Sequence, residues 1–318
     1  MQAPQCAGAD KGNEMASTLC NYLPELLCTF PEIDDTAMRI ARKGIDDSFK
    51  GFVRAYGNVI DAVTDPLQIF LNWLEALLVD SPWFIILAVM VLIVYLTSRN
   101  MRIVALTIIG MLFIGFVGLW EDTMITLAIV TVSTMLAIII GIPIGILMAR
   151  SDRAQAVVNP ILDVMQTMPS FVYLIPVVMI FGIGKVPGVI AVVIYAVPPM
   201  IRLTNLGIRL VDVEVLEAAD AFGSSSRQKL MNVQIPLALP TVMAGINQTI
   251  MMSLAMVVVA SMIGVGGLGK NVLQAIANQF LTIGFLNGFA LVTIAIIFDR
   301  ASQAYGKRLQ RHTEVVHG

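Results

Sequence analysis

Seven long stretches of this chain contain no charged residue, and the shortest of them holds 16 residues. A helix needs about 20 apolar residues to cross the hydrocarbon core of a bilayer. Seven such stretches are too many for the core of one small soluble domain, and they lack the alternation of transmembrane β-strands. The chain is also 57% hydrophobic and 13% charged, against about 25% charged residues in soluble domains. The sequence therefore predicts an all-α membrane protein.

The charge-free stretches place about seven transmembrane helices. The expected spans cover residues 82–98, 103–120, 123–149, 167–184, 186–202, 239–263 and 283–299. The expected organisation is an N-terminal tail (1–80), two first helices (81–120), a main transmembrane domain (121–304) and a C-terminal tail (305–318). Gly141 and Gly145 form a small-xxx-small pattern that favours close helix packing.

Positive charge is distributed very unequally between the two sides of the expected bundle. One set of connections carries twelve Lys and Arg residues, whereas the other carries only Lys185 and Lys270. Short cytoplasmic loops are enriched in Lys and Arg. The distribution predicts a multi-pass protein of a bacterial cytoplasmic membrane, with the N-terminus outside and the C-terminus inside.

The N-terminal tail contains one amphipathic pattern and all three cysteines. Apolar residues recur at helical spacing at Ile45, Phe49, Phe52, Val53, Tyr56, Val59, Ile60 and Val63. This helix could lie on the membrane surface, pack against the bundle or bridge through solvent. Cys6, Cys20 and Cys28 form no CxxC pair, and a Cys20–Cys28 disulfide requires a tail outside the cytoplasm. No metal site is expected.

The connection between residues 202 and 239 is too long for a simple turn and has the pattern of two short helices. The first runs from about Val213 to Phe222, and Gly223 suits a left-handed cap at its end. Ser225 and Gln228 form a capping-box pattern for the second helix, which Pro236 is expected to end. The pattern predicts a helical element that projects from the membrane.

This element resembles a motif of one transporter family. Glu217-Ala218-Ala219, Gly223 and the closing Val233-Gln234-Ile235-Pro236 are similar to the EAA motif of ABC-importer permeases. The spacing is complete, with Val233 in place of Ile and Ile235 in place of Leu. The resemblance implies a type I importer bundle.

In such a bundle, residues 212–236 would act as a coupling helix that contacts a cytoplasmic ATPase. The residues that the resemblance assigns to the ATPase contact are Glu217, Ala218, Ala219, Asp220, Phe222, Gly223 and Ser224.

The sequence also argues against several chemical functions for this chain. The sequence has no GxxxxGK[ST] loop, so ATP and Mg are expected to be used by a separate ATPase subunit and not by this chain. No catalytic residue, metal ligand, cofactor or nucleic-acid partner is expected. A membrane enzyme is the weakest alternative, because the spans supply mainly scattered Ser and Thr.

Further segments resemble the glycine betaine/proline betaine permease subfamily. They are DVMQTMP from Asp163, FVYL from Phe171, FGIG from Phe181, GINQT from Gly245 and ASMI from Ala260. The resemblance implies a homodimer that imports a quaternary-ammonium osmolyte delivered by an extracytoplasmic binding protein. Choline, trimethylamine N-oxide, a sulfonium osmolyte and an amino acid such as histidine are alternative substrates. A stand-alone channel or ion-coupled carrier would leave the EAA element unexplained.

Candidate pathway residues are less specific. Phe171, Tyr173 and Tyr195 either line the pathway or belong to the core. Asn247 and Gln248 lie within an expected span, where they should face other helices or a cavity. The glycine-rich segment 264–269 is either an external gate or an ordinary turn. No acidic residue lies deep in the spans as drawn, which favours a low-affinity path driven by ATP.

Overall fold

The computed structural model describes residues 34–314, which include no strand, and its chain divides into two compact units, residues 1–57 and 58–318. Residues 35–57 form the first part of helix α3 (Asp35–Val79). Of the expected apolar face in this part, Ile45 is 69% exposed. What this face contacts stays a prediction, and the three cysteines lie outside the described residues.

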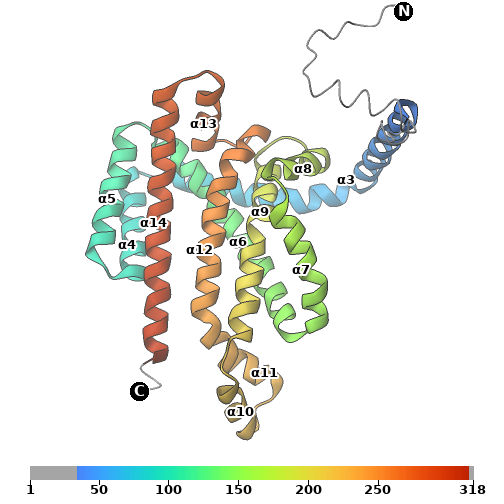
Figure 1. Cartoon of the computed structure of the whole chain (residues 1–318). Coiled ribbons are helices and arrows are strands. Elements are labelled where there is room, and N and C mark those ends of the chain that lie inside the picture. Colours follow the sequence, from blue (N-terminus) through green and yellow to red (C-terminus); the bar gives the residue numbers. More distant parts are fainter. Residues whose placement is uncertain (1–33, 315–318) are drawn as a thin grey trace, which may run out of the picture. The chain divides into compact units, whose positions relative to one another are not determined.

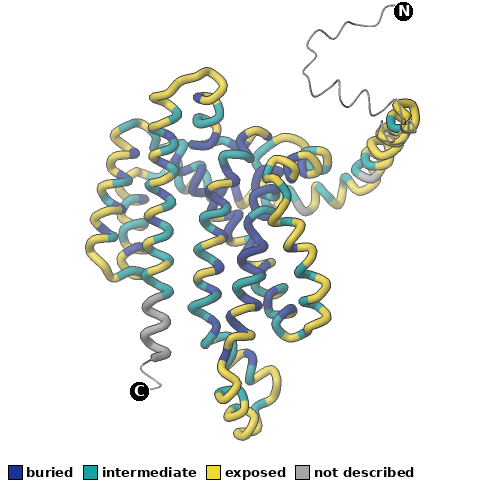
Figure 2. Tube along the Cα trace, in the orientation of Figure 1, coloured by how far each residue is buried: buried dark blue, intermediate teal, exposed yellow. Residues whose placement is uncertain are grey.

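Three long helices form the centre of the second unit: α6 (Trp120–Arg150), α9 (Lys185–Arg209) and α12 (Ile235–Ala260). Helix α9 packs along both of the others (Figure 1), and the buried residues concentrate on these three helices (Figure 2). The apolar window of α9 is 72% buried, against 56% for that of α6 and 39% for that of the segment that contains α12. Helix α9 therefore lies at the centre of the bundle.

Two glycines allow α6 to approach α9 closely. A β-carbon added at Gly141 would lie 2.7 Å from Met200 Cγ, and one added at Gly145 would lie 2.8 Å from the Ile201 carbonyl oxygen. Both distances are too short for a real side chain. The predicted small-xxx-small contact is confirmed, and it joins α6 to the middle and last part of α9.

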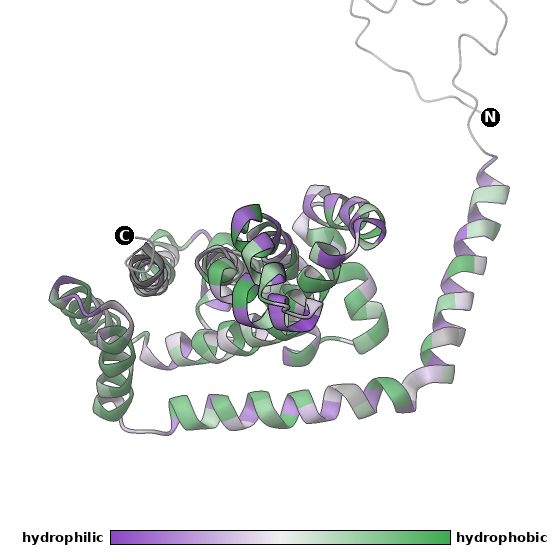
Figure 3. Ribbon diagram, turned by 90° about the horizontal axis from the view of Figure 1, so that it is seen from below, coloured by the Kyte–Doolittle hydropathy of each residue, from purple (hydrophilic) through white to green (hydrophobic). Residues whose placement is uncertain are grey.

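A second group of helices packs beside this centre. Helices α4 (Trp83–Ser98) and α5 (Met101–Phe116) pack on each other and on α14 (Leu281–Glu314), which also packs against α12 (Figure 1). The short α13 (Leu268–Ala277) packs on α14. Viewed along the bundle, α4 and α5 are almost uniformly hydrophobic (Figure 3), and Ile109 and Phe116 are largely exposed. Apolar side chains exposed on such a scale are typical of a surface in contact with lipid.

The expected span 167–184 is wrong, because this segment is not one continuous helix. Helix α7 (Asp152–Thr167) ends there, and a 3-10 turn η1 (Ser170–Tyr173) and helix α8 (Leu174–Phe181) follow at an angle of 110°. Met168 precedes Pro169 and adopts an extended conformation with ψ 133°, because a following proline disfavours the helical region. The chain therefore turns sharply inside what the sequence presents as one apolar stretch.

The other expected spans each overlap a helix, although the span 103–120 runs past the end of α5 at Phe116. Four helices of the described part are long and apolar enough to cross a membrane, or up to six if each of two bent pairs counts as one span, and α5 is a shorter apolar helix. The second bent pair joins the end of α3 to α4 at 105°. The all-helical membrane fold is thus confirmed.

The glycine-rich segment after α12 forms a tight, closely packed turn. Gly267 has φ +86°, and a β-carbon there would lie 2.9 Å from the Asp122 carbonyl oxygen. The Leu268 backbone N–H donates to Thr126 Oγ1 at 2.9 Å, and the Gly184 N–H donates to the Ile263 carbonyl at 2.9 Å. These contacts join the neighbouring ends of α6, α9 and α12. We call the region where these three helix ends meet the closed end of the bundle.

Candidate functional site

The predicted projecting element is present at the opposite end of the bundle, where α10 (Val213–Ala221) and α11 (Ser226–Lys229) extend beyond the other helices (Figure 1). The Asp212 side chain caps the start of α10 by accepting from the Glu214 N–H at 3.0 Å. Gly223 (φ +76°) ends it: its N–H donates to the Asp220 carbonyl at 2.8 Å, and the next N–H donates to the Ala219 carbonyl at 3.0 Å. This is the Schellman arrangement. The predicted first helix and its glycine cap are confirmed.

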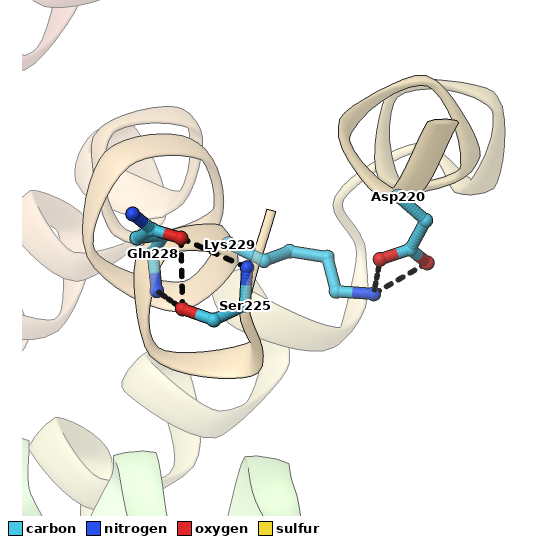
Figure 4. A network of polar contacts seen from close by, with 4 residues as sticks. All are labelled: Asp220, Ser225, Gln228 and Lys229. Carbon is cyan, nitrogen blue, oxygen red and sulfur yellow. Dashed lines mark hydrogen bonds and ion pairs between the residues drawn. The ribbon is translucent and has the colours of Figure 1, made fainter. Parts of the chain in front are cut away.

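Polar contacts fix α11 and hold it to α10. Ser225 and Gln228 form the predicted capping box. Lys229 Nζ then reaches back across the turn to both carboxylate oxygens of Asp220 at 2.6 Å (Figure 4). The Lys229 side chain is 23% exposed and that of Asp220 is 55% exposed. The two short helices therefore have a defined mutual orientation.

Pro236 does not end the second helix, contrary to the prediction. The chain passes from α11 through a π-helical turn (Leu230–Gln234) directly into α12, and Pro236 lies in the first turn of that helix. A proline is tolerated there because the first backbone N–H groups of a helix have no intrahelical partner. The projecting element is thus continuous with a central helix of the bundle.

The predicted contact residues form an exposed surface. Phe222 is 91% exposed, which is unusual for an aromatic side chain of a soluble surface. Glu217, Ala218, Asp220 and Gly223 are also exposed, whereas Ala219 and Ser224 are partly buried. Within the described part of the chain, the Glu217 carboxylate has no hydrogen bond or ion pair. An unpartnered carboxylate, a small exposed Ala218 and an exposed ring are suited to a protein partner with an apolar pocket and a basic group.

The three aromatic pathway candidates have different environments. The rings of Tyr173 and Tyr195 make an edge-to-face contact with centroids 6.2 Å apart, and Tyr173 is 6% exposed. The Tyr173 hydroxyl donates to the Met165 carbonyl of α7. Phe171 is instead 55% exposed. The tyrosines therefore join the bend after α7 to α9, and Phe171 is the one accessible ring.

The polar residues of α12 show one feature that the sequence analysis missed. Asn247 donates from Nδ2 to Asp299 Oδ1 at 3.0 Å and accepts from Ser302 Oγ at 2.6 Å, so it joins α12 to α14. Asn247 and Gln248 also line a cavity of about 440 Å³ between these helices. Because α14 continues past the end of the expected span 283–299, Asp299 lies inside a candidate span of the structure (Leu281–Gly306) and not at its end. The signal available in the sequence was the spacing of two polar residues, Asp299 and Gln303, on the same helix.

The structure separates the predicted site residues into three places: the α10–α11 element, the Tyr173–Tyr195 contact at the bend after α7, and the cavity lined by Asn247 and Gln248. The EAA segment forms a single surface at one end of the bundle. The described part of the chain contains no group of His, Cys, Asp and Glu suited to hold a metal ion. The arrangement is that of a membrane transport component with a projecting contact element.

Known proteins support that class. A family profile described as "binding-protein-dependent transport system inner membrane component" matches residues 141–311. The chain is 47% identical over 249 residues to the glycine betaine/proline betaine transport system permease protein ProW of Escherichia coli, covering 78% of this chain and 70% of the relative. It is 45% identical over 262 residues to the glycine betaine/carnitine transport permease protein GbuB of Listeria monocytogenes, covering 82% and 91%.

The fold is also found among solved structures. A chain of the MetNI methionine ABC transporter in an inward facing conformation matches with a TM-score of 0.55 and 20% identity, covering 60% of this chain and 95% of that one. The chain shares the fold of an ABC transporter membrane component. It belongs to the family of binding-protein-dependent transport system inner membrane components.

Proposed function

We propose that this chain is the permease subunit of an ATP-driven importer of glycine betaine or a related methylated-ammonium osmolyte. Two copies form the path, a cytoplasmic ATPase drives them, and an extracytoplasmic binding protein delivers the substrate. ATP and Mg are used by the ATPase. In this arrangement the α10–α11 end and the C-terminus face the cytoplasm, and the closed end and the N-terminus face outward.

The observation that carries the proposal is the exposed surface of α10. Phe222 is 91% exposed on a short helix whose two ends are fixed by Asp212 and Gly223. Fixing the backbone before binding lowers the entropy that association costs, and a central aromatic side chain is a frequent energetic anchor of interfaces. The surface therefore fits the role of docking in a groove of the ATPase.

Relatives support the substrate class. ProW and GbuB are both named for glycine betaine, whereas a trimethylamine N-oxide permease of Ruegeria pomeroyi is 35% identical over 263 residues. The greater likeness to the glycine betaine permeases favours that substrate for this chain.

The test is uptake by proteoliposomes that contain the chain with its ATPase and binding protein. We expect ATP-dependent uptake of labelled glycine betaine. Glu217→Lys should abolish it and reduce retention of the ATPase on the purified permease, because the substitution reverses a charge on the exposed contact surface. Glu121→Lys is the matched control for retention, since Glu121 is an exposed carboxylate in the first turn of α6, at the other end of the bundle.

The competing functions give different outcomes in the same assay. Uptake that persists without ATP or ATPase would reject the proposal in favour of a channel or ion-coupled carrier. ATP-dependent uptake of choline, trimethylamine N-oxide or histidine in place of glycine betaine would support an ATP-driven importer but reject glycine betaine as its substrate. Normal ATPase retention by Glu217→Lys would reject the role given to α10.

A further inference from the structure

Arg209, the last residue of α9, contacts two other helices of the bundle and one residue of its own helix. Its Nη2 donates to the Met148 carbonyl at 2.9 Å and to Asp152 Oδ1 at 2.7 Å, and its Nε donates to Asn205 Oδ1 at 3.1 Å. Met148 lies in the last turn of α6, where backbone carbonyls have no helical partner. A cation at the carboxyl end of a helix is also electrostatically favourable. One guanidinium thus joins the end of α6, the start of α7 and α9.

Arg209 also lies directly beside the projecting element. Only Leu210 and Val211 separate it from Asp212, the N-cap of α10, and Val211 is 7% exposed. This connection is short and partly buried, so α10 can move little without moving the end of α9. A displacement of α10 must therefore act on the end of α9 where Arg209 holds the α6–α7 corner.

Two further contacts tie α7 to its neighbours along its length. Asp163 pairs with Arg202 of α9, and the Met165 carbonyl accepts from the Tyr173 hydroxyl after the bend. Asp152 pairs with the later arginine and Asp163 with the earlier one, so α7 runs antiparallel to α9. The contacts form a series from the base of α10, along α7, to the bend that holds Tyr173.

An apolar cluster makes α7 part of a rigid unit with α6 and α9. Leu162 of α7 is 1% exposed and packs with Ala137 and Met148 of α6 and with Val197 and Ile201 of α9. This cluster is separate from the main core. Packed helices of this kind move as bodies, because close-packed interiors resist gradual deformation.

We infer that Arg209 is a positioning residue that fastens α7 to the base of α10, so that α7 transmits a displacement of α10 to the bend at Tyr173. The inference rests on the proposed function. Without the contacts of Arg209 to α6 and α7, α10 can still bind the ATPase, but its movement displaces only the end of α9 and is not passed to α7.

The test uses the complete transporter in proteoliposomes and measures glycine betaine taken up per ATP hydrolysed. Arg209→Gln should lower this ratio about tenfold, within the range of measured couplings between sites, with normal retention of the ATPase. Arg209→Lys keeps the charge but loses the fork of donors, so its ratio should be intermediate. Arg153→Gln is the matched control, because Arg153 is an exposed arginine in the first turn of α7 and the described residues provide no partner for its side chain.

A second variant guards against misfolding of the first. Asp163→Asn removes the other α7–α9 ion pair at a side chain that is 66% exposed, and the ratio should fall about threefold, a loss of coupling below 1 kcal/mol by the constant of 1.4 kcal/mol per factor of ten. Wild-type ratios in Arg209→Gln and Asp163→Asn would overturn the inference. If the wild-type transporter itself shows no ATP-dependent uptake, the proposed function has failed and not the inference.

Discussion

The two ends of the bundle are stabilised by different means. At the closed end, backbone groups and glycines make the contacts: Gly184, Gly267 and Leu268 join three helices through hydrogen bonds and close approach. At the α10–α11 end, charged side chains hold short exposed helices, as in the Asp220–Lys229 pair. The ends are separated by α9, whose 25 residues span about 37 Å at 1.5 Å per residue.

The difference indicates which end can change its contacts at low cost. Backbone packing at the closed end has little freedom, because a shift would leave buried hydrogen-bonding groups unpaired. Exposed ion pairs contribute little stability and can be exchanged for contacts with a partner. The α10–α11 end therefore suits an interface that forms and moves, and the closed end suits a fixed joint.

The largest effect should come from the same glycine-to-alanine substitution, made separately at each end of the bundle. Gly267→Ala places a β-carbon 2.5 Å from Thr126 Oγ1 and 2.9 Å from a backbone oxygen, at φ +86°. Strained backbone and overpacking together should cost about 3 kcal/mol of folding stability. Gly223→Ala has a similar φ of +76° but open space around the β-carbon, so it should cost about 1 kcal/mol. Thermal unfolding of the purified protein measures both, and equal losses would contradict the comparison.

Much of this contrast can be predicted from the sequence, because it depends on local patterns. The α10 helix, its Gly223 cap and the Ser225–Gln228 box follow from residues within a few positions of one another. The charge-free stretches likewise predict the long helices, since length and hydropathy decide whether a segment crosses a bilayer. The EAA spacing predicts which surface is exposed.

Features that depend on distant residues could not be predicted in this way. The bend at Met168 has a local cause in Pro169, but hydropathy does not show it, because the bend lies inside an apolar stretch. The contacts of Arg209 join residues 57 and 61 positions apart, and only the packing of α6 and α7 on α9 brings them together. Pro236 was misjudged because a proline at the start of one helix and a proline at the end of another have the same local sequence signature.

A smaller effect should distinguish the ion pairs of the two ends. Lys185, at the start of α9, contacts both carboxylate oxygens of Glu75 at 2.7 Å, and Glu75 is only 16% exposed. Lys185→Gln leaves this carboxylate poorly solvated and should cost about 1–2 kcal/mol. Lys229→Gln frees the more exposed Asp220 and should cost roughly 0.2–1 kcal/mol. Unfolding at low and high salt tests this, because the pair with the more exposed carboxylate should lose more of its contribution on adding salt.

The smallest effect on stability should accompany a large effect on assembly. Phe222 is 91% exposed, so Phe222→Ala should change the free energy of unfolding by less than about 0.5 kcal/mol. As the aromatic anchor of the proposed interface, it should nonetheless weaken ATPase binding at least about tenfold. Phe116→Ala provides the control, because Phe116 is 93% exposed but belongs to the lipid-facing α5.

Titration of the detergent-solubilised variants with the ATPase measures both affinities. Weaker binding for Phe222→Ala alone would locate the interface on α10, because the two rings match in residue type and exposure and differ only in position. Equal weakening by both would mean that loss of any exposed ring perturbs the purified protein. Unchanged binding by both would place the ATPase contact elsewhere and remove the functional meaning of the contrast between the two ends.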